Sequence, residues 1–433
     1  MRMYDIIRKK RDGGILTKEE IRFFTKGLTD GSVPDYQAAA LCMAIFLKGM
    51  NRDEIAELTF AIRDSGERLN LSAIKGIRAD KHSTGGVGDK TSLVVAPAVA
   101  ALGIKVAKVS GRGLAHTGGT VDKLESIPGY RTNLTDEEFI DCVNRIGASI
   151  IGQTRGVAPA DKKLYAIRDV TATVDCLPLI VSSIMGKKLA ADDDIIVLDV
   201  KCGSGSFNKT PEISRELAEC MVDIGKKAGK KMLAIITDMD RPLGAAIGNA
   251  LEVQEAIETM KGRGPEDFTR LCEELIAGIL CLAGKGSREE CLKMAADCLT
   301  DGSALAKFRE MIEAQGGNSA VIDDYSLFGT ARFMHKVLSP VSGYIASADT
   351  EGYGAASLLL GAGRNTIEED IDPCAGIILE KKTGDYVKKG DIIATLYTDR
   401  EESIPASEEK LVSSTRFSDK KPEEKPLILE RVD

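Results

Sequence analysis

Two glycine-rich segments hold the residues that are best suited to chemistry. Residues 81–92 read KHSTGGVGDKTS, and residues 108–120 read KVSGRGLAHTGGT. Each combines a lysine, hydroxyl side chains and small residues with accessible backbone, which are the groups that hold a phosphate-sized anion. Neither segment matches GxxxxGK[ST] and neither is a clean GxGxxG, so an ATP-hydrolysing P-loop is disfavoured.

One glycine-rich loop is weak evidence, because glycines also serve ordinary turns. Two loops of the same chemical type favour phosphate binding more strongly, because their donors can converge on one anion. The side chains expected to bind phosphate are Lys81, Ser83, Ser92, Lys108, Ser110 and Thr120.

The chain has only three histidines, at positions 82, 116 and 335. His82 lies between Lys81 and Ser83, where it could donate a charge-assisted hydrogen bond to a leaving group or act as a general acid. A loop histidine bonded to backbone explains the same pattern, and both alternatives apply to His116 as well. His335 is expected to be structural. No cluster of histidine and cysteine has zinc-site spacing.

Three further polar residues lie in a helical stretch at 159–190: Arg168, Ser183 and Lys187. Ser183 and Lys187 are one helical turn apart, so they share a face. Such a face could contact the carbonyls and ring N–H of a planar heterocycle. On spacing alone, an exposed polar helix is the more ordinary interpretation.

The elements around the loops predict how both loops meet. Residues 93–102 are apolar and end at Gly103, which predicts a helix, and residues 104–109 predict a strand that leads into the second loop. The order strand, loop, helix, strand, loop brings both loops to the same edge of a parallel sheet. Ligands of α/β proteins bind at that edge.

The whole chain divides into three regions by its patterns. Residues 1–70 predict helices, residues from 77 onward alternate strands and helices, and residues after 336 are rich in strands and turns. The fold class is therefore α/β: a small all-helical domain, a large α/β domain with a mostly parallel sheet, and a C-terminal α+β subdomain. The predicted domains are 1–70 plus 159–190, 71–158 plus 191–335, and 336–433. Within them, strands are expected at 104–109, 149–151, 195–200 and 232–237, and helices at 265–284, 288–299 and 303–315.

Composition excludes several kinds of protein. The 433 residues are 43% hydrophobic and 5% aromatic, without tryptophan, and 58 basic against 66 acidic residues give a net charge of −8. This favours a multidomain enzyme and argues against a nucleic-acid partner. Ten cysteines without a CxxC pair indicate reduced thiols, and no segment is apolar enough to span a membrane. A cytoplasmic protein without a membrane partner is expected.

Residues 110–125, SGRGLAHTGGTVDKLE, resemble the hallmark motif of the thymidine and pyrimidine-nucleoside phosphorylases. The likeness covers essentially the whole chain. It continues in residues 80–89, 159–171, 182–185, 242–252 and 359–364.

The resemblance implies reversible phosphorolysis, in which phosphate attacks C1′ of a pyrimidine nucleoside and yields free base and α-D-ribose 1-phosphate or its 2-deoxy analogue. It also implies a homodimer whose helical domain faces the α/β domain across a cleft. The pyrimidine would bind Arg168, Ser183 and Lys187, with His82 at the base O2 to offset the charge on the departing ring. By the same resemblance, phosphate binds Lys81, His82, Ser83, Ser92, Lys108, Val109, Ser110 and Thr120.

The resemblance to this family also implies a site for a monovalent cation, namely potassium, held by backbone oxygens and one carboxylate. The matching positions are Gly88, Lys90, Leu243, Ala246 and Glu255. Lys90 stands where a hydroxyl residue is expected, so its ammonium is expected to point away from the ion. No organic cofactor is expected. The glycine pattern at 343–391 resembles biotinyl and lipoyl folds without their acceptor turn, which favours a scaffold.

Other functions are compatible with parts of the pattern. A phosphoribosyltransferase of related fold would need an acidic pair for magnesium, for which Asp192, Asp193 and Asp194 are the candidates. A non-catalytic carrier built on the C-terminal domain would bear a covalently attached cofactor. Among nucleosides, a broad specificity for uridine, thymidine and deoxyuridine is expected, with thymidine selectivity as the alternative. By resemblance, Leu114, Val174, Ile180 and Phe207 could line the base pocket.

Overall fold

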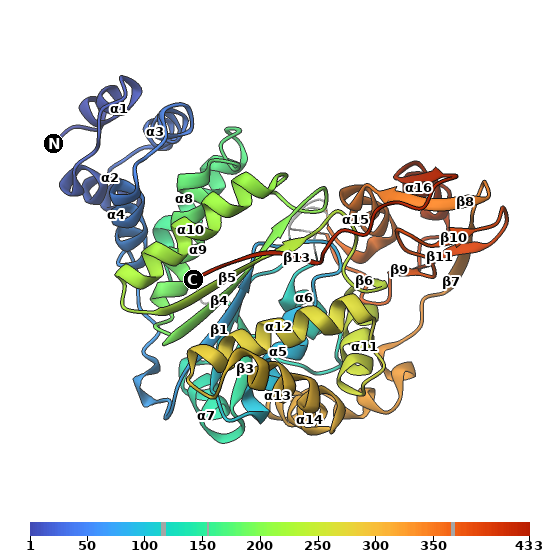
Figure 1. Ribbon diagram of the computed structural model, residues 1–433. Helices are drawn as coiled ribbons and strands as arrows, with labels where there is room; N and C mark the ends of the chain where they lie inside the picture. Colours follow the sequence, from blue (N-terminus) through green and yellow to red (C-terminus); the bar gives the residue numbers. More distant parts are fainter. Residues whose placement is uncertain (114–117, 154–155, 365–368) are drawn as a thin grey trace.

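The computed structural model describes residues 1–113, 118–153, 156–364 and 369–433 of the chain (Figure 1). Its first region is a helical unit. Capping boxes at Thr17 with Glu20 and at Asn51 with Glu54 set the starts of the second and fourth helices. The helices are α1 Met3–Arg11, α2 Lys18–Asp30, α3 Asp35–Lys48 and α4 Arg52–Arg63.

Two later helices complete this unit, α8 (Pro159–Asp169) and α9 (Leu177–Ala190). Leu164 and Leu179 of this excursion are buried with Phe24 and Leu41 of the N-terminal helices in one apolar cluster. The excursion therefore docks on the N-terminal helices, as Figure 1 shows.

The central sheet has the order β1-β4-β5-β13. Its strands β1 (Ala79–Ser83), β4 (Ile195–Cys202) and β5 (Lys231–Asp238) are parallel, and β13 (Ile428–Val432) joins antiparallel at one edge. All eight residues of β4 are buried, as expected for a strand covered on both faces.

A second parallel pair continues this arrangement beside β1. It consists of β2 (Val106–Ser110) and β3 (Ala148–Gly152), and it is linked to β1 by a parallel bridge between Arg78 and Lys105. Because β1 and β2 run in the same direction, the loops that follow them leave at the same edge. The predicted meeting of the two glycine-rich segments is confirmed at this level.

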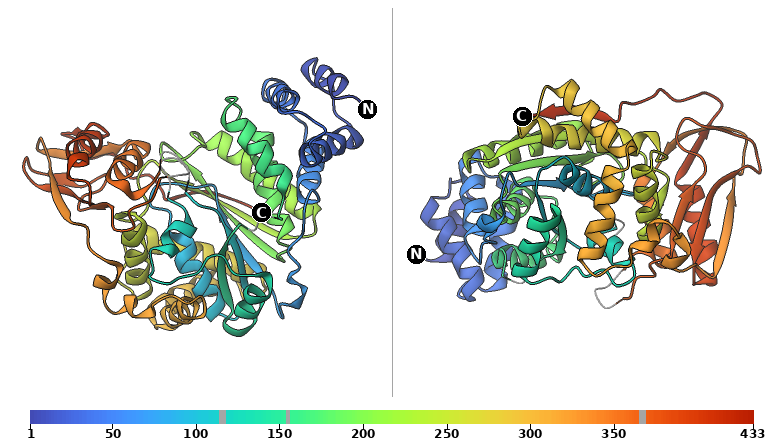
Figure 2. Two further views of the ribbon diagram at one scale, coloured as in Figure 1. Left: turned by 180° about the vertical axis from the view of Figure 1, so that it is seen from behind. Right: turned by 90° about the horizontal axis from the view of Figure 1, so that it is seen from below.

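Helices cover both faces of the sheet (Figures 1 and 2). Ile195 and Val197 of β4 pack into the cluster formed with α5, α11, α12, α13 and α14, whereas Ile196 and Leu198 pack against α9 and α10. The helices of this region are α5 Thr91–Ala101, α6 Thr120–Glu125, α7 Asp136–Ile146, α10 Pro211–Lys227, α11 Asn249–Met260, α12 Glu266–Leu282, α13 Arg288–Thr300 and α14 Ser303–Ala314.

The C-terminal unit contains two antiparallel sheets, of orders β6-β9-β11-β7 and β10-β8-β12. Their strands are β6 Ala246–Gly248, β7 Phe333–Leu338, β8 Gly343–Ala348, β9 Gly376–Leu379, β10 Tyr386–Val387, β11 Ile392–Thr398 and β12 Thr415–Ser418. The helical segments are α15 Thr350–Ser357, the π-helix η4 Leu358–Ala362 and α16 Ile404–Ser413. Short 3-10 turns complete the chain: η1 Leu71–Ala73, η2 Ser319–Ile322, η3 Tyr325–Phe328 and η5 Glu401–Ser403.

The predicted fold class is confirmed: a helical unit, an α/β unit with a mostly parallel sheet, and an α+β unit. The end of the predicted segment 336–433 differs, because β13 returns to the central sheet and pairs with β5. Ile428, Leu429 and Val432 pack against the cores on the two faces of that sheet. The sequence pattern did not predict this short apolar strand, because Pro422, Pro426 and the charged residues around them interrupt the pattern that is typical of a strand.

Two further expectations concern membrane spans and thiols. No helix in the described ranges is long and apolar enough to cross a membrane. All ten cysteines are free thiols, most of them buried, in agreement with the reduced state expected from their spacing.

Candidate active site

Lys81 anchors the first loop from inside β1. Its side chain is 3% exposed, and its Nζ donates to Thr91 Oγ1 and lies 3.7 Å from both Asp89 Oδ1 and Asp199 Oδ2. Asp199 in turn pairs with Lys201 at 2.7 Å. Although burial alone would raise the pKa of Asp89, Lys81 and Lys201 hold that pKa well below its usual range. Lys81 is therefore a fixed cation beneath the loop.

Lys108 approaches Lys81 from β2. Its Nζ donates to the Lys81 backbone oxygen and lies 3.3 Å from Asp80 Oδ1. Burial, together with the fields of Lys188 and Lys81, lowers the pKa of Lys108 to about 8 against the opposing effect of Asp80. Lys81, Ser92 and Lys108 line one small cavity, so the structure brings these three predicted phosphate residues together.

The other predicted phosphate residues lie where the loops begin and end. Ser83 closes β1, and its Oγ accepts from the Gly85 N–H at 3.1 Å. Val109 and Ser110 close β2, and Thr120 is the first residue of α6. Ser83, Val109, Ser110 and Thr120 are half-buried, so each can reach a ligand at this edge.

His82 lies on β1, directly after Lys81. Its Nε2 is buried and has no hydrogen-bond partner in the part of the chain that the structure describes. Burial, followed by the fields of Lys188 and Lys108, lowers the pKa of His82 well below its usual range. The imidazole is therefore neutral in the protein without an anion, and a bound dianion would favour its protonation.

Of the other two histidines, His335 is the one among the described residues. His116 and Leu114 lie outside the described residues. His335 Nε2 is 2.8 Å from Glu408 Oε2 in the C-terminal unit, in agreement with the structural role expected for it.

The predicted base-binding face lies on α8 and α9. Lys187 Nζ donates to Ser183 Oγ at 3.0 Å and to Asp161 Oδ2 at 2.5 Å, so the shared face of Ser183 and Lys187 is confirmed. Asp161, which the sequence analysis did not single out, is 3% exposed, and its Oδ1 has no partner among the described residues.

Arg168 stands apart from that pair in its contacts. It is 1% exposed and donates to the backbone oxygens of Thr173 and Leu179 at 3.2 Å each, and to that of Val174. Its guanidinium also lies 5.5 Å from the centre of the Tyr165 ring. Burial lowers the pKa of Arg168. Two backbone oxygens of the segment between α8 and α9 and one of α9 itself thus hold the Arg168 guanidinium in place.

An ion pair joins the two predicted binding faces. Lys188 Nζ on α9 lies 2.7 Å from Asp80 Oδ2 on β1 and donates to Val109 O at 3.2 Å. Burial would raise the pKa of Asp80, but Lys108 and Lys188 hold it at about 2. Sequence reasoning missed this bridge because Asp80 and Lys188 merely flank predicted site residues, and nothing in the sequence marks them as partners.

The second loop is tied to the C-terminal unit. Asp122 accepts from the Gly113 N–H at 2.6 Å, from Arg112 at 3.0 Å and from Arg364 at 2.6 Å. The buried carboxylate of Asp122 therefore joins the second glycine-rich segment to Arg364, and both lie in segments that carry the family resemblance.

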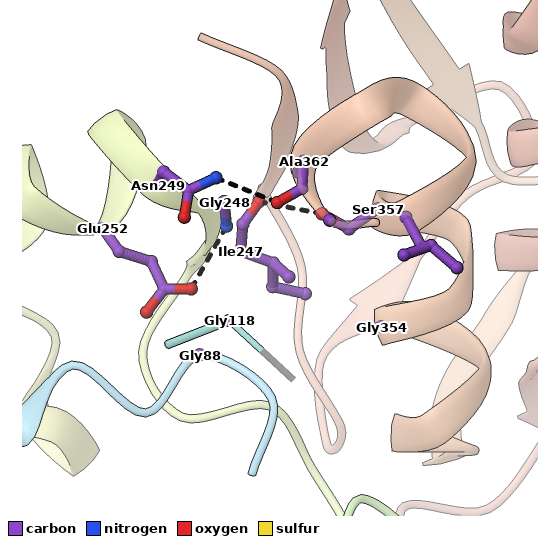
Figure 3. A pocket seen from close by; sticks show the side chains of 11 residues that line it. Gly88, Gly118, Ile247, Gly248, Asn249, Glu252, Gly354, Ser357 and Ala362 are labelled. Atoms are coloured by element: carbon purple, nitrogen blue, oxygen red, sulfur yellow. Dashed lines mark hydrogen bonds between the residues drawn. The ribbon is translucent and has the colours of Figure 1, made fainter. Parts of the chain in front are cut away.

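A pocket lies next to both loops and the C-terminal unit (Figure 3). Gly88 and Gly118 line one side of it, and α15 and η4 line the other. Asn249 Nδ2 donates to Ala362 O at 2.9 Å across its rim, as Figure 3 shows. The C-terminal unit is therefore bonded to α11 at the rim of a pocket that Gly88 and Gly118 of the loops also line.

The residues expected to hold a monovalent cation do meet, but Lys90 is oriented differently from the expectation. Its Nζ donates to Leu243 O and Ala246 O at 3.0 Å each and to Glu255 Oε2 at 2.7 Å. A Cβ on Gly88 would lie 2.5 Å from Leu243 O, so this backbone is closely packed. The expectation that the ammonium points away from these oxygens is wrong.

The acidic run at 192–194 lies away from the loops. It precedes β4, whereas the loops follow the carboxyl ends of β1 and β2. Asp194 pairs with Arg78 and Asp192 with Lys230, each at 2.7 Å, and burial raises the pKa of Asp193 well above its usual range. Among the described residues, no group of three or more histidine, cysteine or acidic side chains could hold a metal ion.

Comparison with protein families gives three matches along the chain. A glycosyl transferase family helical bundle domain matches residues 4–66, a glycosyl transferase family a/b domain matches residues 75–305, and a pyrimidine nucleoside phosphorylase C-terminal domain matches residues 344–418. These matches run in the same order as the three structural units.

Two similar relatives and one solved structure extend this comparison. Pyrimidine-nucleoside phosphorylase of Geobacillus stearothermophilus is 52% identical over 433 residues, covering 100% of both chains. That of Bacillus subtilis (strain 168) is 54% identical over 402 residues, covering 93% of both. Anthranilate phosphoribosyltransferase from Thermus thermophilus superimposes with a TM-score of 0.58 at 20% identity, covering 71% of this chain and 98% of that one, which establishes a common fold only.

Proposed function

Since the chain belongs to the pyrimidine-nucleoside phosphorylase family, we propose that it catalyses the reversible phosphorolysis of pyrimidine nucleosides. Phosphate attacks C1′ of the nucleoside, the N-glycosidic bond breaks, and the products are free base and (2-deoxy)-α-D-ribose 1-phosphate. The enzyme is a pentosyltransferase, and its substrates are inorganic phosphate and a nucleoside.

One observation carries the proposal: the Asp80–Lys188 ion pair fixes a cationic anion-binding edge next to a polar helical face. Lys81 and Lys108 supply buried positive charge at the edge, and Ser183 and Lys187 supply donors on the face. This arrangement supports a reaction in which an anionic nucleophile and a planar leaving group are held on opposite sides of one sugar carbon.

The chemistry needs no covalent enzyme intermediate. Positioned phosphate meets an oxocarbenium-like centre, and positive charge near the departing base stabilises the negative charge that develops on it. We assign this last role to His82 at the base O2, with Arg168 and Lys187 at the other carbonyl and Ser183 at the ring nitrogen. A bound phosphate dianion would favour the protonated imidazole of His82, which burial and then the nearby lysines disfavour.

The finer properties belong to the same proposal. We propose broad specificity for uridine, thymidine and deoxyuridine, with thymidine selectivity as the alternative, and a cytoplasmic location. A phosphoribosyltransferase is disfavoured because Asp192 and Asp194 are paired with cations at the amino end of β4. A carrier protein would show a mass shift from an attached cofactor.

We also propose a homodimer. Tyr36, Met43 and Leu47 lie at helical spacing along α3 and expose 74%, 37% and 69% of their surface. Such an apolar stripe on the helical unit favours contact with a second copy of the chain.

The direct test is release of free base from uridine, thymidine and cytidine, each with and without inorganic phosphate, in potassium buffer. Phosphate-dependent release from uridine and thymidine supports the broad activity, and release from thymidine alone selects the narrower one. If no nucleoside releases base when phosphate is present, the proposal fails. Consumption of free base in the presence of a diphosphorylated ribose would then be assayed for transferase activity.

A further inference from the structure

We infer that the ammonium group of Lys90 is itself the monovalent cation of the site formed with Leu243, Ala246 and Glu255, so the protein needs no potassium there. The family resemblance implies a metal ion among these residues, and the structure places a lysine nitrogen among them instead. Cation binding and stability at this site can be measured independently of the nucleoside reaction.

The ammonium is fully coordinated by the groups that would bind a metal ion. It has three N–H donors, and they reach two backbone oxygens and one carboxylate oxygen at 2.7 to 3.0 Å. The Lys90 side chain is 0% exposed and the Glu255 side chain 7% exposed. The ring of Phe268, centred 5.1 Å from Nζ, covers the ammonium with its electron-rich system.

The same contacts leave no place for a second cation. A potassium ion on these oxygens would stand against the ammonium that already binds them, and one carboxylate cannot compensate two buried charges. The remaining acceptor capacity of Glu255 is also used, because Oε1 accepts from the Ala245 N–H and Oε2 from the Ala246 N–H, both at 2.7 Å. The residues present therefore fit one cation, which the chain supplies covalently.

The ammonium fixes the first glycine-rich loop. Leu243 N–H donates to Val87 O at 3.1 Å, so the 243–246 turn and the loop are joined at Val87 as well as through the Lys90 ammonium. The next residue, Thr91, accepts from Lys81. Lys90, whose side chain is buried, thus positions the segment that carries the predicted phosphate donors.

A tethered cation and a bound ion differ in one measurable property. A protein that binds an ion only in its folded state gains stability as the ion concentration rises. A lysine contributes its charge at any salt composition. The unfolding temperature of this protein should therefore not depend on which monovalent cation is present.

The test is the thermal unfolding midpoint, Tm, of the full-length protein in potassium, ammonium, sodium and tetramethylammonium chloride at constant ionic strength. The wild-type Tm is expected to be the same in all four salts. Lys90→Ser removes the ammonium and restores a hydroxyl and a cavity. Its Tm is expected to fall in tetramethylammonium and to rise with the logarithm of added potassium or ammonium.

Two control variants separate this effect from general salt effects. Lys90→Met fills the space without a charge, so its lowered Tm should not respond to potassium. Lys10→Ser removes another buried lysine, which lies 2.7 Å from Glu54 in the helical unit, and it measures the response of an unrelated buried ion pair.

The wild-type Tm tests the inference even if the variants do not fold. A wild-type Tm that rises specifically with potassium overturns the inference. A folded Lys90→Ser protein that responds to potassium and ammonium no more than Lys10→Ser also overturns it. Neither result bears on whether nucleosides are cleaved, because no substrate is present in the measurement.

Discussion

At the scale of single residues, buried lysines are the main feature of the candidate site. Lys81, Lys108 and Lys188 converge on Asp80 and on the loop after β1, and each is less than 10% exposed. Lys108 and Lys188 share the single carboxylate of Asp80, so two ammonium groups are buried beside one counter-charge, and an incoming dianion would relieve the cost of that burial. The buried lysines therefore support the proposed phosphate site.

Replacing His82 and Lys81 in turn should separate chemistry from phosphate binding. His82→Ala is expected to lower kcat by roughly 10²- to 10³-fold with little change in the phosphate KM, because it removes charge stabilisation at the departing base. Lys81→Met, which keeps the side-chain volume, is expected to raise the phosphate KM instead. Steady-state kinetics with varied phosphate measure both, and equal mild effects from the two variants would contradict these roles.

The pKa of Lys108 gives a pH dependence with a definite sign. Because this pKa is lowered to about 8, Lys108 is charged below that pH and loses its charge above it. We expect kcat/KM for phosphate, which reports the free enzyme, to fall as pH rises through about 8. Lys108→Arg, which stays charged, should move this decline to higher pH. An unchanged profile in that variant would assign the decline to another group.

At the scale of elements, close packing between α4 and α9 positions the face that is predicted to bind the base. Gly186 lies on α9 between Ser183 and Lys187, and a Cβ there would come within 2.6 Å of Ile62 Cγ2 on α4. The absence of a side chain lets the two helices approach each other, and so sets where the face points.

Gly186→Ala should therefore destabilise the protein although alanine is the better helix former. We expect a loss of about 1 to 3 kcal/mol from overpacking, measured by urea unfolding. Lys226→Ala, at an exposed position of α10, is the matched control and should change stability by no more than about 0.5 kcal/mol. A neutral or stabilising Gly186→Ala would mean that α9 can shift away from α4 without cost.

Several apolar clusters, one of them shared by the helical unit and a face of the central sheet, organise the whole molecule together with a few polar connections. The helical unit, the two faces of the central sheet and the C-terminal unit each have an apolar cluster. The Asp80–Lys188 pair joins the first two units, and β6 and β13 tie the α/β and C-terminal segments to each other.

The exposed apolar stripe on α3 predicts that the protein is a homodimer. Met43→Asp combined with Leu47→Asp places two charges on the stripe and should convert a dimer to a monomer. Light scattering after size-exclusion chromatography measures the mass. Tyr4→Asp, at an exposed residue of α1, tests whether the neighbouring helix contributes. A wild-type protein that elutes as a 46.4 kDa monomer would contradict the proposed dimer.

The sequence by itself determined the three-part fold, the meeting of the two loops and the shared face of Ser183 and Lys187. These follow from periodicity and from the fixed geometry of parallel strands and helical turns, which are local properties. Only the tertiary structure decided the Asp80–Lys188 bridge, the return of β13 to β5, and the direction of the Lys90 ammonium. Each of these depends on a partner more than 100 residues away along the chain, and no local pattern encodes such a pairing.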